Sequence, residues 1–230
     1  MNEPGEEMRP YLEPTRFIDS DSREIIQFAR QSTQGMLSHR EKAVALYYRV
    51  RDGIRYDPYH IDFSPHALKA STVLSRGSGF CVEKAILLAA SARALGIPSR
   101  LGFAIVRNHL TTERLRERMK TDVFVFHGFT ELFLDERWVK ATPVFNLSLC
   151  QRFGVPPLEF DGRHDSIFHP FDRRGHKYME YLHDYGRFAD LPYELMVREF
   201  RTHYPQFFEE GIALEGDFEA DASRADLGTS

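Results

Sequence analysis

Between residues 77 and 100 the chain passes from a glycine-rich turn into a dense run of alanine and leucine, and then to a glycine–proline stop. Residues 80–95 give the clearest helix prediction in the chain, because Gly96 lies just past its end and Pro98 lies beyond, the order typical of a helix C-terminus. Cys81 stands in the first turn of this helix. A fold for this chain must therefore present one cysteine at a helix N-terminus, directly after a turn.

The remaining pattern predicts helices before this segment and an antiparallel sheet after it. A cluster of capping residues at 19–22 predicts the start of a first helix. Apolar residues recur at steps of three and four in a second helix, and strand-like runs joined by a hairpin turn follow later. The expected helices continue at 38–54, 80–95, 111–120, around 178–182, and 191–208, and the expected strands lie at 100–106, 122–134 and 138–142. The sequence thus predicts an α+β fold, with helices packed on an antiparallel sheet.

The domain organisation is expected to be simple. Residues 1–18 are proline-punctuated and polar, which predicts a flexible lead-in. Residues 19–214 are predicted to form a single domain with a C-terminal helical extension, and residues 57–78 and 154–176 are expected to be loop-rich. Residues 215–230 are acidic, small and polar, a composition that predicts a disordered tail.

Composition bounds the function classes. The 230 residues carry a net charge of −4 and no long basic block, so neither a nucleic-acid partner nor a polybasic membrane patch is expected. No apolar run approaches the ~20 residues that span a bilayer, and the first residues lack a secretory pattern. The two cysteines exclude a disulfide scaffold. We therefore expect a soluble, cytoplasmic protein with a free thiol and no membrane partner, and its oligomeric state stays open.

Cys81 is the candidate nucleophile. The first N–H groups of a helix lack intrahelical partners, and the helix dipole places partial positive charge there. Both effects favour a thiolate, the attacking form of cysteine. The N–H of Cys81 is also a candidate oxyanion donor. Cys150 follows no glycine turn, and we interpret it as a packing residue.

His127 is the candidate base. A thiol nucleophile needs an imidazole within hydrogen-bond reach, and of the ten histidines only His127 lies inside a strongly strand-like run. Because side chains alternate along a strand, His127 should share one face with Phe129 and Glu131, while Gly128 and Thr130 face the other side. A rigid strand can hold an imidazole in place better than a loop can.

These residues together resemble the transglutaminase-like superfamily. The segment 93–100 is similar to an "RxxGIPAR" phrase that ends the cysteine-bearing helix of bacterial members. Residues 127–131 resemble the "HxWxE" strand, and Trp138 followed by Thr142-Pro143 resembles the "W…D-x-T" return. The resemblance extends over residues 40–146. It implies a papain-like (transglutaminase-like) core with a Cys-His-Asp triad, of which Cys81 and His127 supply the first two members.

The third member of the triad does not carry over. The position expected for the aspartate is Thr142 when counted from Trp138 and Lys140 when counted back from Thr142-Pro143, and neither residue is acidic. The Thr142 hydroxyl could orient the His127 ring across the hairpin. Asn146 is a second candidate, because an amide can hold the imidazole tautomer. Asp161 and Asp165 are a third possibility. The departure also leaves open a catalytically degenerate relative.

No metal or cofactor is expected. The spacing of His164, His169, His176 and His183 matches no zinc motif, and no paired cysteines accompany them. The turn at 77–79 lacks the Lys-Ser/Thr of a P-loop and the strand–glycine spacing of a dinucleotide site.

The function expected from the resemblance is that of a cysteine enzyme acting on an amide or peptide bond through an acyl-thioester. We expect hydrolysis rather than amine transfer, since no acceptor site is recognisable, and a protein, a peptide or a small amide as substrate. The alternatives are a degenerate peptide-binding module on the same fold, and acyl transfer from a small thioester donor as in arylamine acetyltransferase-like enzymes.

Overall fold

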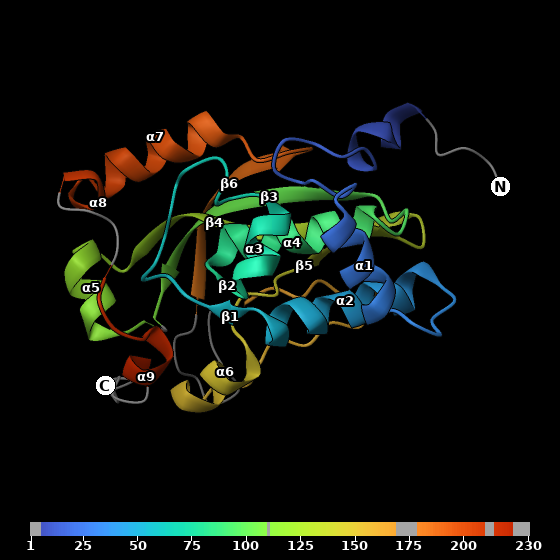
Figure 1. Cartoon of the computed structure of the whole chain (residues 1–230). Helices are drawn as coiled ribbons and strands as arrows, with labels where there is room; N and C mark the ends of the chain where they lie inside the picture. The colour runs from blue at the N-terminus through green and yellow to red at the C-terminus, as the bar shows by residue number, and fades with distance from the viewer. Residues whose placement is uncertain (1–5, 110, 169–178, 210–213, 223–230) are drawn as a thin grey trace.

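A computed structural model describes residues 6–109, 111–168, 179–209 and 214–222 (Figure 1). The helices are η1 (Glu6–Tyr11, 3-10), α1 (Arg23–Ser32), α2 (His39–Gly53), α3 (Ala70–Arg76), α4 (Cys81–Arg93), α5 (Glu113–Met119), α6 (Leu147–Phe153), α7 (Tyr193–His203), α8 (Gln206–Glu209) and α9 (Phe218–Ala222). The strands are β1 (Arg55–Tyr56), β2 (Ser78–Gly79), β3 (Ser99–Asn108), β4 (Val123–Leu134), β5 (Arg137–Ala141) and β6 (Met179–Phe188).

The principal sheet is antiparallel throughout. Its strand order is β5-β4-β3-β6, so the long central pair β3–β4 is flanked by β5 on one side and β6 on the other. Asp135 and Glu136 turn the chain from β4 into β5 with positive φ angles of 48° and 63°. With helices packed on this sheet (Figure 1), the α+β class predicted from the sequence is confirmed.

Helix α4 lies at the centre of the molecule. Every residue of α4 after Cys81 is buried, because α1, α2 and α3 pack on it from one side and β3 and β4 from the other (Figure 1). Its small alanine side chains allow this close approach, and buried apolar area is the dominant favourable term in folding. The predicted stop is confirmed: the helix ends at Arg93, and Gly96 turns the chain with φ +74°.

The two faces of the sheet have different environments. On one face Gly128 and Thr130 contact α4, and the Thr130 hydroxyl donates to the carbonyl of Ala85 (2.9 Å). His127 and Phe129 project from the opposite face, as strand alternation predicts. The sheet therefore separates a helix-covered core from a face that carries the imidazole.

The upstream helices begin at the predicted caps. The Ser22 side chain accepts the N–H of Ile25 and starts α1. Ser38 and Glu41 form a reciprocal capping box at the start of α2. Both helices bury one side against α4, so they fix its position relative to the sheet.

One element is of a different type from the one expected. The segment around 178–182 was predicted as a helix from Met179, Tyr181 and Leu182, but Met179–Phe188 forms β6 and pairs with β3. Pairing with a strand more than 70 residues earlier outweighs a short local pattern that fits either period. Residues 57–78 and 154–176 were expected to be loop-rich; the first contains α3, and Leu147–Phe153 adds the unpredicted helix α6.

The boundaries of the folded region are wider than expected. The predicted flexible lead-in ends in the core, where Phe17 and Ile18 are buried, and η1 precedes them. The predicted disordered tail contains α9, whose Phe218 is buried. Apolar residues at 17, 18 and 218 explain the difference, since each buries a large side chain. Residues 223–230 lie outside the described part of the chain.

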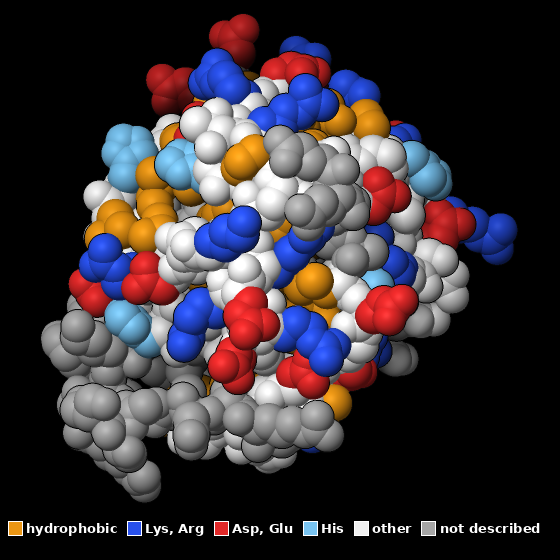
Figure 2. Space-filling model, turned by 90° about the vertical axis from the view of Figure 1, so that its left-hand side faces the viewer, with side chains coloured by type: hydrophobic (Ala, Val, Ile, Leu, Met, Phe, Trp, Pro, Cys, Tyr) orange, Lys and Arg blue, Asp and Glu red, His pale blue; other side chains and the backbone are white. Residues whose placement is uncertain are grey.

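The surface shows no dominant charge on the face that Figure 2 presents. Basic and acidic side chains are interspersed there, with hydrophobic side chains exposed between them. Within the described ranges, no helix has the length and apolar character needed to cross a membrane.

Candidate active site

The turn before Cys81 is held by a short parallel ladder. β2 pairs with β1, and the N–H groups of Arg55 and Asp57 donate to the carbonyls of Gly77 (2.9 Å) and Gly79 (3.1 Å). Glu83 accepts the N–H of Phe80 (3.0 Å) and so caps the first turn of α4. Cys81 is consequently fixed as the first residue of the helix, as the sequence predicted.

The Cys81 sulfur lies among backbone N–H groups. Its own N–H and those of Val82 and Gly128 act on the sulfur and lower the pKa of the thiol. Burial of the sulfur is the larger effect, and the nearby Glu83 carboxylate adds to it, so the pKa of Cys81 rises to about 11. The helix N-terminus favours the thiolate as expected, but the loss of solvation is the larger effect and favours the neutral thiol.

His127 lies in β4, where it pairs in register with Ala104 of β3. Its ring is 6.2 Å from the ring of Phe168 and 6.4 Å from the ring of Tyr181, between centroids. Burial among these rings lowers the pKa of His127 to about 4, so the imidazole is neutral at physiological pH. Its Nε2 is buried and has no hydrogen-bond partner among the described residues.

The backbone at Gly128, next to His127, lies beside Cys81, but no hydrogen bond joins the Cys81 sulfur to the His127 ring among the described residues. The N–H that acts on the Cys81 sulfur belongs to the peptide joining His127 to Gly128. A Cβ at Gly128 would lie 2.9 Å from the Val82 Cα and 3.3 Å from the Cys81 carbonyl oxygen, so only glycine allows the strand to approach the helix this closely. The Tyr181 ring packs on the His127 ring, and burial, with a smaller effect of Cys81, raises the pKa of Tyr181.

Thr142 does not complete a triad in this geometry. The β4–β5 register ends at Thr130 opposite Ala141, so Thr142 follows the end of the strand and does not lie across from His127. Its hydroxyl is buried without a partner among the described residues, and its carbonyl accepts from the Tyr47 hydroxyl (3.3 Å).

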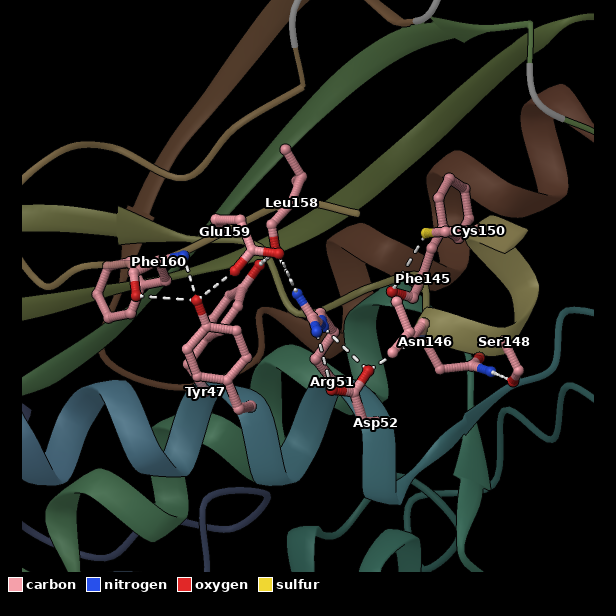
Figure 3. A network of polar contacts seen from close by, with 12 residues as sticks. Tyr47, Arg51, Asp52, Phe145, Asn146, Ser148, Cys150, Leu158, Glu159 and Phe160 are labelled. Atoms are coloured by element: carbon pink, nitrogen blue, oxygen red, sulfur yellow. Dashed lines mark hydrogen bonds and ion pairs between the residues drawn. The ribbon is translucent and has the colours of Figure 1, made fainter. Parts of the chain in front are cut away.

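Asn146 is engaged elsewhere. Its Oδ1 accepts the N–H of Tyr56 (3.0 Å), and its Nδ2 donates to Ser148 (2.7 Å) and to Glu219 (3.3 Å). Figure 3 shows the side chain beside Ser148 at the start of α6. Both amide atoms are therefore used to tie α6 to β1 and α9, and neither hydrogen-bonds to the imidazole.

The remaining acidic candidates belong to a surface turn beside β5. Asp161 accepts from the backbone and ring of His164, and Asp165 accepts the N–H of Lys140 (2.9 Å). Neither hydrogen-bonds to the His127 ring. Cys150 is buried, with its sulfur 3.8 Å from the carbonyl oxygen of Phe145 (Figure 3), in keeping with a packing role.

The histidine series of the loop region shows no metal set in the described part of the chain. No group of three His, Cys, Asp or Glu side chains there could hold a metal ion. His169 and His176 lie outside the described residues. His164 pairs with Asp161, and His183 stacks against Tyr185, 5.1 Å between ring centroids.

Sequence reasoning missed two residues that shape this site. Tyr181 was assigned to a helix, so its place beside His127 could not be foreseen. Gly128 was assigned correctly to the face opposite His127, but its contact with α4 depends on tertiary packing. The glycine within an otherwise bulky strand, Phe126-His127-Gly128-Phe129, was the signal of a close backbone approach.

Comparisons with known proteins give one family match and two similar solved structures. The family model of the transglutaminase-like superfamily matches residues 26–143, just over half of the chain. Two solved structures are similar: a candidate cysteine protease from Cytophaga hutchinsonii (19% identity, TM-score 0.48) and a candidate protease from Parabacteroides distasonis (19% identity, TM-score 0.37). The matches cover 61% and 55% of this chain but only 43% and 26% of those proteins. No curated protein matches the chain.

The matched region contains the features described above. It runs from α1 to the end of the β4–β5 hairpin, and so includes both Cys81 at the start of α4 and His127 on β4. With the cysteine-led helix packed on the antiparallel sheet in this order, the chain belongs to the transglutaminase-like superfamily.

Proposed function

We propose that this protein is a cysteine-dependent enzyme that cleaves an amide or peptide bond, with Cys81 as the nucleophile and His127 as the general base. The observation that carries the proposal is the contact of the His127–Gly128 peptide with the Cys81 sulfur at the N-terminus of α4. A helix N-terminus, a thiol and an imidazole on one rigid frame are the groups that acyl transfer needs.

The reaction begins with neutral groups. The pKa of His127, about 4, leaves the imidazole able to accept a proton, and Cys81 holds its proton at rest. Transfer of that proton to His127 produces a thiolate that faces three backbone N–H groups. The thiolate attacks the substrate carbonyl, and the oxyanion that forms can accept from the Cys81 N–H.

An acyl-thioester then forms as His127 returns the proton to the leaving amine. Water resolves the thioester in a hydrolase, and a second amine resolves it in a transglutaminase. We favour water because no acceptor site for an amine is recognisable in the sequence. No hydrogen bond from the described residues orients the His127 ring, so in this proposal His127 acts without an aspartate from that part of the chain.

The test is acylation of the protein by N-acetylglycine benzyl thioester, followed by intact mass measurement. We expect one acyl group on Cys81, and a loss of acylation rate of about a thousandfold or more in Cys81→Ala. His127→Gln should slow the reaction strongly while leaving the fold intact. Cys150→Ala is the matched control, because it removes the other cysteine and should acylate normally.

A degenerate peptide-binding module is the second candidate. The unpartnered Nε2 of His127 and the raised pKa of Cys81 favour it, since both describe a site without an activated pair at rest. In that case peptides would bind equally well to the wild type and to Cys81→Ala, and no acyl group would appear on Cys81. Equal acylation of the wild type and Cys81→Ala would rule out the enzyme.

A further inference from the structure

A pocket lies on the same face of the sheet as His127. Its volume is about 390 Å³, within the range of sites that hold small ligands. Strands β3, β4, β5 and β6 all contribute to it. The lining side chains are Ala104, Phe129, Lys140, Ile167, Tyr181, Leu182, His183 and Asp184.

Small residues on β3 make room for the pocket. The Phe129 ring lies over Gly102, where a Cβ would be only 2.4 Å from the ring atoms. The ring can therefore lie close against the sheet. The small side chain of Ala104 beside it leaves space above the floor of the pocket. The floor is apolar, so polar recognition falls to the side chains at its rim.

The pocket adjoins the proposed reacting groups. Ala104 on its floor pairs in register with His127, and Phe129 is two residues along the same strand face. Tyr181 on its wall contacts the His127 ring at 6.4 Å. The pocket therefore lies beside His127, on the face of the sheet that carries the imidazole.

Among the described side chains around the pocket, Lys140 is a cation that forms no ion pair, although the carboxylates of Asp184 and Asp165 lie near it. Asp184 is neutralised by Arg187 (2.7 Å), and Glu131 is bound between Arg187 (2.5 Å) and Arg100 (2.6 Å). Lys140 lies opposite Glu131 in the β4–β5 register, yet no ion pair joins its ammonium to a carboxylate in the described part of the chain. Its Nζ lies 5.7 Å from the centre of the Phe129 ring, and Asp165 binds its backbone N–H.

We propose that this pocket selects substrates that carry a carboxylate close to the scissile bond, and that Lys140 binds that carboxylate. The apolar floor at Phe129 and Ala104 would hold the intervening methylene groups. The carboxylate can belong to an acidic side chain or to the C-terminus of a peptide, since both present the same group. This proposal rests on the proposed function, because it assigns a substrate class to the same site.

The experiment compares charged and neutral thioesters of equal size. N-acetyl-glutamyl and N-acetyl-glutaminyl benzyl thioesters test a side-chain carboxylate. N-acetylglycine thioesters of 3-mercaptopropionate and of its amide test a carboxylate on the leaving side. We expect the wild type to prefer one charged member about tenfold in kcat/KM, and the preferred pair tells which source the pocket accepts.

Variants of Lys140 test whether the preference for a charged substrate arises in this pocket. Lys140→Met should remove it, and Lys140→Glu should reverse it, each read as the ratio of kcat/KM between the charged and the neutral member of a pair. Lys42→Met on α2 removes a lysine away from the pocket and should keep the preference. Calorimetric titration with N-acetylglutamate amide against N-acetylglutamine amide measures the same preference without turnover, and covers the case of slow chemistry.

The outcomes separate the two proposals. If Cys81-dependent turnover occurs but both members of each pair react equally, the carboxylate pocket is overturned and the proposed function stands. If Lys140→Met retains the full preference, the assignment to Lys140 is overturned. If no thioester acylates Cys81, the proposed function fails, and equal calorimetric affinities for N-acetylglutamate amide and N-acetylglutamine amide then overturn the carboxylate pocket as well.

Discussion

Burial and hydrogen bonding act in opposite directions on the Cys81 thiol. Three N–H groups stabilise a thiolate there, yet desolvation keeps the proton on the sulfur at neutral pH. The same desolvation keeps His127 neutral. The charged pair would form only when each charge can stabilise the other around a bound substrate. Slow alkylation of Cys81 in the free protein would therefore agree with either candidate function, which makes substrate-driven acylation the sharper test.

Lys84 is a second residue whose charge is opposed by burial. It is fully buried in α4, and its Nζ donates to the carbonyls of Arg51 (2.9 Å) and Ile54 (2.6 Å) at the end of α2. Burial lowers its pKa from 10.5 to about 7. Between these values the unfolded chain binds a proton that the native protein lacks. Stability should rise with pH there by up to about 1.4 kcal/mol per unit.

Denaturant unfolding between pH 7 and 8.5 measures this effect. The free energy of unfolding of Lys84→Met should not show this increase. The free energy of unfolding of the wild type minus that of the variant should therefore rise by about 1 kcal/mol per pH unit. Lys42→Met, at a partly exposed lysine of α2, should run parallel to the wild type. Parallel curves for Lys84→Met as well would contradict a lowered pKa at Lys84.

Individual site residues differed in how far the sequence could place them. Cys81 and His127 could be placed because each depends on local signals, a turn entering a helix and a histidine within a strand. Thr142 and Asn146 could not, because their roles depend on partners far along the chain. Asn146 bonds to Tyr56 and Glu219, at separations of 90 and 73 residues.

At the scale of elements, the sequence predicted an element correctly where its hydrophobic period and its end signals indicated the same structure. α2, α4 and the β4–β5 hairpin carry both signals, and all three formed as predicted. β6 carries neither: its apolar residues do not alternate strictly with polar ones, and it is an edge strand whose central residues are exposed. Its conformation is set by pairing with β3, which a local pattern does not reveal.

Gly128 tests how tightly β4 and α4 are packed. In Gly128→Ala the new methyl group would meet the Val82 Cα at 2.9 Å and the Val82 nitrogen at 3.2 Å, both backbone atoms. The strand and the helix must then move apart, and we expect a loss of about 2 kcal/mol in the free energy of unfolding. Acylation of Cys81 should also fall, because the Gly128 N–H moves away from the sulfur.

The matched control is Gly53→Ala at the end of α2. No atom lies within 4 Å of a Cβ there, so the change should be neutral or stabilising by up to about 1 kcal/mol. Urea unfolding of both variants gives the comparison. A Gly128→Ala protein as stable as Gly53→Ala would show that the strand does not contact the helix backbone.

On the scale of the whole molecule, helix α9 near the C-terminus packs against residues from the N-terminal half of the chain and from α6. Phe218 of α9 packs on Tyr56, which follows α2, on Tyr59, and on Phe153 of α6, at ring-centroid distances of 5.5, 5.3 and 6.1 Å. Composition predicted a disordered tail, because the segment is acidic and small on average. One aromatic residue, Phe218, anchors the segment by packing among three other aromatic rings. The average composition of the segment does not reveal this single contribution.

Because of these contacts, we expect a substitution at Phe218 to lower the stability of the protein and to affect residues far from it in the sequence. It is 3% exposed, and Phe218→Ala should lower the free energy of unfolding by about 3 kcal/mol through lost burial and a cavity. Because Tyr56 lies near Cys81, the loss should also loosen β1 and reduce the acylation rate. Leu37→Ala, at a side chain 90% exposed, should change stability by less than about 0.5 kcal/mol. Equal midpoints for both variants in urea would mean that α9 does not hold Tyr56, and the site would then owe its shape to α4 and the sheet alone.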